Sequence, residues 1–287
     1  MKKNNIILLS FFFLSISLFS QVNLNYTKDN NKNLYIAQKK TVIDESILNI
    51  QYRMFYVKDT KNPDMKKSYY MELQIGKQIS KFSDYQRLKI DSLEEVFMKQ
   101  KLDEIQVVNN VLSLGRGTSS LNIFKNYPIN KITITDRVPV SGNFKYVEDK
   151  TKPIWKMERG STDVCGYTCQ KASTTFRGRK YTAWYAPKIP YSDGPWKFWG
   201  LPGLILKIAD DKNEYSFECV VIEKPKKTES IYIKDIDYYN TTRVKFNEAV
   251  RKFYNNPGPM FENKGIKVDG KPIGNKSLPY NPIELGE

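Results

Sequence analysis

The sequence contains no histidine. This absence excludes serine and cysteine catalysis with a histidine base, and it excludes the commonest zinc and copper ligand sets. The carboxylates give no other catalytic signal, because the adjacent pairs Asp103–Glu104 and Asp210–Asp211 diverge on a helix or strand. Such pairs are more typical of a solvated helix face and a turn than of a glycosidase. We therefore predict no catalytic residue, no metal and no cofactor.

The sequence also has no more than one long apolar segment. The one long apolar run, Ile6–Phe19, follows the basic residues Lys2 and Lys3 and is too short for a comfortable membrane span. This arrangement is typical of a secretory signal peptide. We predict that residues 1–20 form a signal peptide, with an uncleaved membrane anchor as the alternative. The mature protein is then expected in the periplasm, at the outer membrane without spanning it, or outside the cell, and away from nucleic acid.

Cysteine is scarce, with only Cys165, Cys169 and Cys219 in the chain. An odd number of cysteines in an exported protein leaves a free thiol or an intermolecular bridge. On one continuous strand, Cys165 and Cys169 would lie roughly 13 Å apart, which is too far for a disulfide. A turn at Gly166 would change that distance, and a bridge from Cys169 to Cys219 across neighbouring strands is an equal alternative. The pairing therefore stays open.

Acidic residues are outnumbered by lysine and arginine, 31 to 46. The formal net charge is +15, or +13 once Lys2 and Lys3 are removed with the signal peptide. A basic exported protein favours anionic partners such as lipopolysaccharide, acidic glycans or a membrane surface. The basic residues are spread along the chain, however, and this spread favours the alternative of a solvated lysine-rich surface.

Aromatic residues are plentiful, with 19 Tyr and 15 Phe, and together with short Ile, Val and Thr runs they favour β-structure. Ser46–Tyr56 and Ser68–Ile75 alternate apolar and polar residues, which predicts a hairpin of half-buried strands, and a short strand is expected at Leu34–Ala37. Further strands without intervening helices indicate an antiparallel meander. They are expected at residues 131–135, 143–148, 154–158, 167–175, 180–185, 204–209 and 215–222.

Two segments have helical periodicity. Tyr85–Lys101 has an apolar stripe that includes Val96, with Ser83 as its N-cap, and helical character continues toward Val111. Thr242–Tyr254 is the second predicted helix. We predict a mainly β (α+β) fold, an antiparallel open sheet or half-barrel with about two helices, in a single domain over residues 21–287.

The stretch from residue 166 to residue 206 crowds glycine, proline, aromatic and basic residues between strand-like runs. Within it, Pro202 fixes its own φ and Gly203 can adopt a positive φ, which suits a type II turn that sets strand register. We favour this structural role. The alternative is that the bare glycine backbone allows a ligand to approach closely.

Arg177 and Arg179 are two residues apart, so both would point to one face of an extended strand. Guanidinium groups beside aromatic rings bind carboxylates, phosphates or sugar faces. We therefore take Arg177, Arg179, Trp184, Tyr185 and Trp196 as candidate binding residues. The alternative is a surface cross-strand pairing, or a buried arginine tied to a structural carboxylate such as Asp163.

The hexapeptide at residues 200–205 is identical to the one that names the GLPGLI family, and the chain resembles that family over most of its mature length. The motifs that carry the resemblance are Gly166-Tyr167-Thr168-Cys169-Gln170-Lys171-Ala172, Arg177-Gly178-Arg179, Ala183-Trp184-Tyr185, Ile189-Pro190, Gly194-Pro195, Gly200-Leu201-Pro202-Gly203-Leu204-Ile205 and Asn281-Pro282-Ile283-Glu284-Leu285. We expect structural roles for Gly166, Cys169, Gly178, Gly194, Pro195, Gly200, Pro202 and Gly203.

The resemblance implies an exported protein of unknown activity in the envelope of Gram-negative bacteria. Members of the family are often encoded beside outer-membrane TonB-dependent receptors, and a similar domain precedes a secreted glycan-releasing amidase. A receptor, a glycan or a peptide is therefore the expected partner.

We predict a noncatalytic binding or assembly factor whose concave β face, lined by tyrosine and tryptophan, holds a peptide, lipid or glycan. The alternative is a secreted glycan- or peptide-directed hydrolase that uses carboxylates or Cys169. Without histidine, a nucleophilic Cys169 would need Lys171 or Arg177 to lower its pKa.

Overall fold

The computed structural model describes residues 34–113, 119–265, 267–268, 271–272 and 274–286, and the residues from Leu34 onward form one compact unit. The predicted signal peptide lies outside the described residues. Among the described residues, no helix is long and apolar enough to cross a membrane.

The unit is built around one large sheet of thirteen strands. Eleven of its strands are β1 (Lys40–Val57), β2 (Lys66–Gly76), β3 (Ser80–Asp84), β4 (Asn122–Lys125), β5 (Lys131–Val138), β6 (Gly142–Asp149), β7 (Lys156–Val164), β8 (Tyr167–Phe176), β9 (Arg179–Ala186), β10 (Leu204–Asp210) and β11 (Tyr215–Glu223). The shorter β12 (Ser230–Lys234) and β13 (Tyr239–Asn240) also join it, and β14 (Lys267–Val268) pairs separately with β15 (Lys271–Pro272).

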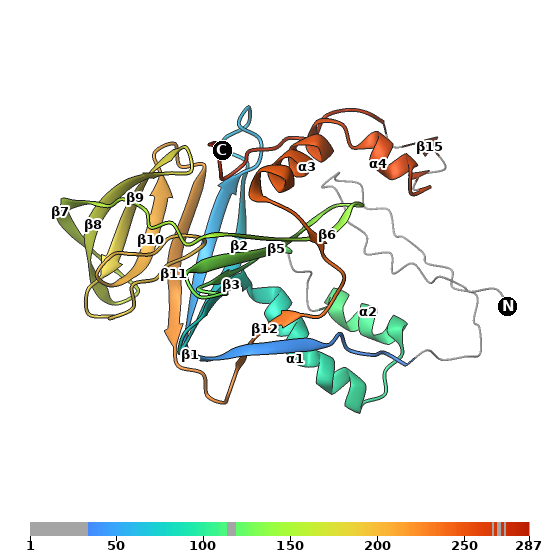
Figure 1. Ribbon diagram of the computed structural model, residues 1–287, viewed down its shortest axis with the longest axis horizontal. Coiled ribbons are helices and arrows are strands. Elements are labelled where there is room, and N and C mark those ends of the chain that lie inside the picture. The colour runs from blue at the N-terminus through green and yellow to red at the C-terminus, as the bar shows by residue number, and fades with distance from the viewer. Residues whose placement is uncertain (1–33, 114–118, 266, 269–270, 273, 287) are drawn as a thin grey trace. The chain divides into compact units, whose positions relative to one another are not determined.

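The strand order is β13-β6-β5-β4-β3-β2-β1-β11-β10-β9-β8-β7, with β12 paired to the first part of β1. Every pairing in the sheet is antiparallel except that of β13 with β6, and the sheet stays open. The predicted mainly β fold with an open antiparallel sheet is confirmed. Figure 1 shows β7 to β11 at one end of the sheet and β5 and β6 toward the other.

The β1–β2 hairpin forms as the alternation predicts, and its apolar side chains face the core. Ile50 and Tyr52 on β1 and Met71 and Leu73 on β2 are almost fully buried. We call this side of the sheet the inner face. Because the side-chain period of a strand is two, the intervening residues share the opposite face, which we call the outer face.

The sheet is strongly curved about its inner face. The rings of Phe82 on β3 and Phe217 on β11 lie 6.0 Å apart, although two strands separate β3 from β11. In a flat sheet, strands three positions apart are roughly 14 Å from each other. Tyr52 likewise donates a hydrogen bond of 2.7 Å to the Ile205 carbonyl on β10, two strands away. The curvature makes the inner face concave.

The described residues contain four helices rather than the two predicted: α1 (Tyr85–Lys99), α2 (Glu104–Ser113), α3 (Arg243–Asn255) and α4 (Gly258–Glu262). Asp84 caps α1 in place of Ser83, because its carboxylate accepts the Arg87 amide hydrogen. Lys101 adopts a positive φ of 53°, so a separate helix follows α1. Val96 is exposed and does not belong to a buried stripe.

The helices cover opposite faces of the sheet. Phe246 on α3 packs against Phe144 and Tyr146 on the inner face, and Phe253 then contacts Phe261 of α4. Helix α1 lies against β2 and β3 on the outer face. Figure 1 shows α1 and α2 on one side and α3 and α4 on the other. Both faces of the β2–β5 part are therefore buried.

Several strand predictions are wrong in detail. Leu34 forms only an isolated bridge to Asp103 rather than a strand over Leu34–Ala37. The strand expected at residues 154–158 begins two residues later and continues to Val164. The short strands β3, β4 and β12 were not predicted, because four or five residues show too little alternation to be recognised.

Candidate functional site

Arg177 and Arg179 do not share the face of one strand, as the sequence predicted. β8 ends at Phe176 and β9 begins at Arg179, so Arg177 and Gly178 form a two-residue hairpin turn. Both turn residues have positive φ, at 50° and 82°, as a type I′ turn requires. A side chain at position 178 would overlap the backbone nitrogen of Gly286. Glycine at this position therefore leaves room for the C-terminal residues to pack against the turn.

The C-terminal residues 278–286, which we call the strap, form neither helix nor strand and contact the ends of several strands. The Arg177 carbonyl accepts the amide hydrogens of Leu285 and Gly286 at 2.8 and 3.3 Å. Asn281 donates to the Val57 carbonyl at 2.9 Å, and its own carbonyl accepts from the Tyr215 hydroxyl. The tail motif of the chain therefore meets the central motif, about a hundred residues away in sequence.

Arg179 joins the middle of the strap to Asp210 and Glu214 and donates every hydrogen that it has. Nη1 donates to Asp210 and Glu214, both at 2.7 Å. Nη2 donates to the Asn281 side chain and the Pro282 carbonyl at 2.6 Å, and Nε donates to the Ile283 carbonyl at 3.1 Å. A guanidinium has five N–H donors, and all five are used here. Arg179 has no donor left for a ligand.

A second buried cation holds the end of the strap. Lys197 lies 2.7 Å from Glu148 and 2.6 Å from Glu284, and its side chain is only 2% exposed. Arg177 and Arg243 complete the cluster, at 3.1 Å from Glu148 and Glu284 respectively. Burial raises the pKa of Glu284, but Lys197 and the two arginines outweigh it and hold that pKa below its usual range. Both carboxylates are therefore matched by cations.

Two of the predicted aromatic binding residues, Trp184 and Tyr185, line neither of the two cavities of the protein's described part. Tyr185 is buried, and its hydroxyl donates to Gln170 at 2.7 Å. Trp184 is half-buried on the other face of β9, where Lys171 lies 5.9 Å from its ring centre. Neither side chain approaches the strap arginines through an aromatic contact in the described residues.

Trp196 is the predicted binding residue that lines a cavity. The loop that carries Trp196 is held in place by the buried Lys125, which forms an ion pair with Asp193 and donates to the Gly194 carbonyl at 2.6 Å. A side chain at position 194 would overlap Ile205, so glycine is required at that close approach. The Trp196 ring then packs edge-on against Phe198 at 5.1 Å.

The Gly200–Ile205 hexapeptide ends this loop and leads into β10. Gly203 has a positive φ of 147°, and its amide hydrogen bonds the Leu201 carbonyl at 2.9 Å. This pattern is a γ-turn at Pro202 rather than the predicted type II turn. A side chain at position 203 would overlap the Ala186 carbonyl, so the close approach to Gly203 comes from the protein's own backbone.

The cavity beside Trp196 lies on the concave inner face and has a volume of about 210 Å³. Met54, Tyr56 and Tyr69 line it with half-buried side chains. Tyr56 contacts the Tyr69 ring at 5.6 Å and stacks on Tyr215 at 5.8 Å. The remaining lining residues are Met71, Phe82, Ser119, Leu121, Trp196, Tyr215, Phe217 and Ile283.

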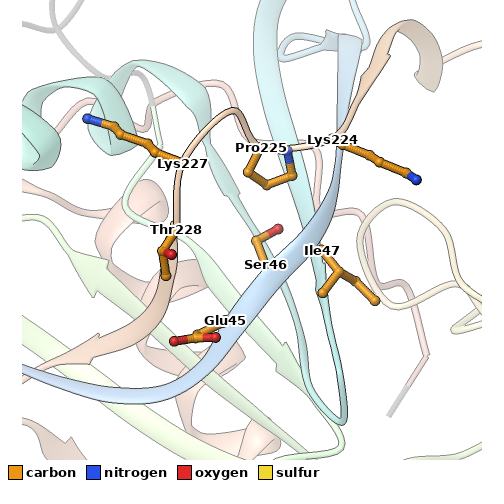
Figure 2. A pocket seen from close by; sticks show the side chains of 7 residues that line it. All are labelled: Glu45, Ser46, Ile47, Lys224, Pro225, Lys227 and Thr228. Carbon is orange, nitrogen blue, oxygen red and sulfur yellow. The ribbon is translucent and has the colours of Figure 1, made fainter.

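A second, more open cavity of about 320 Å³ lies where β1 bends and the chain passes from β11 to β12. Glu45, Ser46, Ile47, Lys224, Pro225, Lys227 and Thr228 line it. Figure 2 shows the Lys224 and Lys227 side chains pointing away from each other. Because their amines do not converge, the cavity has no focus of positive charge for an anion.

The outer face under α1 contains ionisable residues that the sequence did not single out. Glu72 and Lys81 are 5% and 2% exposed, and Gln74 and Ser83 beside them each have a buried oxygen without a hydrogen-bond partner in the described residues. Burial, followed by the charges of Glu229 and Glu223, raises the pKa of Glu72 to about 7. Alternation alone could not reveal this site, because it places Glu72 and Gln74 on the polar face of a half-buried strand and does not predict the short strand β3.

Burial also lowers the pKa of the Lys81 amine to about 7. No described carboxylate lies within ion-pair distance of this amine, which instead sits over the Tyr232 ring at 4.0 Å. A lysine and a carboxyl with pKa values near neutrality are the type of groups that enzymes use as acids and bases. Neither of the two cavities is lined by them.

The described residues offer no activated nucleophile at Cys169. The thiol is fully buried, and its hydrogen bond goes to the Tyr167 carbonyl at 3.4 Å. Burial raises its pKa to about 11, whereas a nucleophilic cysteine needs a lowered pKa. All three cysteines are free thiols in the structure, and no group of three Cys, Asp or Glu side chains among the described residues could hold a metal ion.

A family model described as a protein of unknown function (Porph_ging) matches residues 175–207. This range begins beside the Arg177–Gly178 turn and ends within β10. No curated protein matches the chain. Two solved structures of PNGF-II, in space groups P21 and C2, are similar to the chain at 13% identity, with TM-scores of 0.48 and 0.47. The similarity covers 73% of this chain but only about a third of those chains, 34% and 33%.

Proposed function

We propose that the protein is an exported, noncatalytic binding or assembly factor of the Gram-negative cell envelope that serves an outer-membrane TonB-dependent receptor. In this proposal, residues 1–20 are removed as a signal peptide, and residues 21–287 act as one domain. The signal-like N-terminal sequence and the resemblance to the GLPGLI family support the location. The concave cavity beside Trp196 supports binding.

The size and lining of that cavity indicate its occupant. Cavities that hold whole drug-sized ligands measure roughly 300–1,000 Å³, whereas about 150 Å³ accommodates a single benzene ring. A volume of about 210 Å³ therefore suits one ring rather than a long acyl chain or a saccharide. Its walls of Tyr, Phe, Trp and Met favour an aromatic group through edge and sulfur contacts. We propose that it receives an aromatic side chain from a protein partner.

The contacts of Arg177 and Arg179 weigh against the binding role that the sequence predicted for them. Arg179 donates three of its five hydrogens to the strap and the other two to Asp210 and Glu214, and Lys197 and Arg177 are matched by Glu148 and Glu284. The central motif then acts indirectly, because it fixes the loop that carries Trp196 and the strap that carries Ile283 to the cavity.

A carboxylate-dependent hydrolase is the second candidate, and the raised pKa of Glu72 is the observation that favours it. Its buried position under α1, outside both cavities, makes it the weaker of the two. The Cys169 version of this candidate is not supported by a buried thiol with a raised pKa.

The test compares Tyr69→Ala with Tyr70→Ala. These neighbours on β2 point to opposite faces, since Tyr69 lines the cavity and Tyr70 is exposed beside Arg53. Binding of N-acetyl-phenylalanine amide would be followed by NMR, with N-acetyl-alanine amide as the apolar control. We expect Tyr69→Ala to weaken binding about tenfold and Tyr70→Ala to leave it unchanged.

Photo-crosslinking in envelope preparations with the same two variants extends the test to the natural partner. A crosslinked receptor that is lost with Tyr69→Ala and kept with Tyr70→Ala would support the proposal. No discrimination between the phenylalanine and alanine probes, or equal behaviour of the two variants at equal thermal stability, would contradict it.

A further inference from the structure

Two lysines follow the tyrosines of the Trp196 cavity along the inner face of the β1–β2 hairpin. Tyr56 of β1 lies opposite Lys67 of β2 in the strand register, and Lys58 is two residues beyond Tyr56. All three side chains are half-buried. Residues opposite each other on paired strands have Cβ atoms about 5 Å apart. Lys67 therefore stands directly beside a ring that lines the cavity.

The Lys58 amine also lies on the inner face. It is 5.9 Å from the ring centre of Tyr254 on α3, the helix that covers this face. Diagonal neighbours on paired strands are roughly 7–8 Å apart, which is within reach of long side chains such as Lys58 and Lys67. Burial, followed by the charge of Lys67, lowers the pKa of the Lys58 amine. An anion bound between the two amines would offset their repulsion.

No carboxylate balances this pair in the part of the chain that the structure describes. Neither amine lies within ion-pair distance of an acidic side chain there. Asp59, the residue after Lys58, accepts a hydrogen bond from the Asn62 side chain at 2.7 Å within the β1–β2 turn. Glu214, whose carbonyl accepts from the last residue of β1, is paired with Arg179 at 2.7 Å. The two lysines are therefore able to bind an external carboxylate.

We propose that the cavity and the two lysines together bind the C-terminal residue of a protein partner when that residue is aromatic. The ring would enter the cavity, and the free carboxylate would lie between the Lys58 and Lys67 amines. This inference rests on the proposed function, in which the cavity receives an aromatic side chain. A lysine ammonium has three hydrogens to donate, so two lysines can satisfy both oxygens of one carboxylate.

A terminal carboxylate suits this arrangement better than the side chain of a neighbouring acidic residue. Successive side chains of an extended peptide point to opposite sides, so an aspartate or glutamate next to the aromatic residue would point away from the cavity. The α-carboxylate belongs to the same residue as the ring. Because Lys67 is the direct cross-strand neighbour of Tyr56, the proposed ring and carboxylate positions are also adjacent.

The experiment compares ligands that differ at the carboxyl end. N-acetyl-phenylalanine carries the free carboxylate, N-acetyl-phenylalanine amide lacks it, and N-acetyl-alanine carries it without the ring. Binding to the purified protein is followed by NMR at low salt. We expect the phenylalanine acid to bind about tenfold more tightly than the amide, and this difference should shrink in about 0.5 M salt. N-acetyl-alanine should not bind.

Lys67→Met and Lys66→Met form a matched pair of variants. Both remove one lysine from β2, but Lys67 is half-buried on the inner face, whereas Lys66 is exposed and points to the outer face. We expect Lys67→Met to lose the preference for the acid and to bind the amide as the wild-type protein does. Unchanged binding of the amide shows that the cavity is intact. Lys66→Met should keep the preference, and Lys58→Met should reduce it.

The outcomes distinguish this inference from the proposed function. If the amide binds and the acid binds no more tightly, or if Lys67→Met keeps the preference, the carboxylate site is wrong and the aromatic cavity stands. Equal binding of N-acetyl-alanine and N-acetyl-phenylalanine would also overturn the inference. An amidated phenylalanyl-aspartate that binds as tightly as the acid would contradict the terminal position of the carboxylate. If neither phenylalanine ligand binds, both proposals are wrong.

Discussion

Arg179 and Lys81 are both almost completely buried, at 3% and 2% exposure, but their surroundings differ. Arg179 donates five hydrogen bonds, two of them to the carboxylates of Asp210 and Glu214. Lys81 has no described carboxylate within ion-pair distance, and the Tyr232 ring is its nearest cation–π partner. A cluster of the first kind keeps its charge and specifies which segments meet. A lysine of the second kind has a lowered pKa, so it stays buried by losing its proton.

The difference separates charged residues that hold the molecule together from residues whose pKa values lie near neutrality. The hydrogen bonds of Arg179 join β9, β10 and the strap, and the matched charges leave little capacity to bind anything else. The outer face under α1 has groups that titrate near neutrality, Glu72 and Lys81. Three substitutions test this contrast.

Arg179→Met should have the largest effect, because it leaves Asp210 and Glu214 without their cation and frees three strap acceptors. Breaking a buried ion pair from one side costs about 3–5 kcal/mol, so we expect the unfolding free energy to fall by that amount. Chemical denaturation measures the change. Lys180→Met, the exposed neighbour on β9, is the control and should change stability by less than about 0.5 kcal/mol.

Lys81→Met should have the opposite sign. The folded pKa of Lys81, about 7, lies below its unfolded value, so between pH 7 and 10 the unfolded chain binds more protons and wild-type stability rises with pH. At pH 6 to 7 we expect the variant to be more stable by about 1–3 kcal/mol, with the advantage fading above pH 10. A destabilised variant at pH 6 would show that the lysine is a paired structural cation like Arg179.

Glu72→Gln should have the smallest effect, and it should depend on pH in another range. The folded pKa of Glu72, about 7, lies above its unfolded value, so the folded state binds more protons between pH 4.5 and 7 and loses stability as pH rises. Glutamine does not ionise, so the variant does not lose stability over this pH range. We expect equal stability near pH 4.5 and an advantage of about 1 kcal/mol at pH 7.5, measured by urea denaturation at both values. A constant difference across that range would argue against a raised pKa.

The strands were predictable where apolar alternation runs for eight or more residues, as it does in β1, β2 and β11. Helix α3 and its N-cap Thr242 were predictable for the same reason, because capping and periodicity are local. The sequence alone misassigned Arg177 and Arg179, since a two-residue turn with positive φ at Arg177 has no strong residue signature. It also did not single out Glu72 and Lys81, because what covers the outer face depends on where α1 and β12 pack.

The amino-acid sequence by itself determined the mainly antiparallel β architecture and the glycine positions in the central motif. Those properties depend on backbone sterics and side-chain periodicity within a few residues. Only the tertiary structure decided that Arg179 donates all of its hydrogen bonds to the strap, Asp210 and Glu214, and that Trp196 lines a one-ring cavity. Each of these depends on the curvature of the sheet, which joins residues far apart in the chain and is set by packing over the whole inner face.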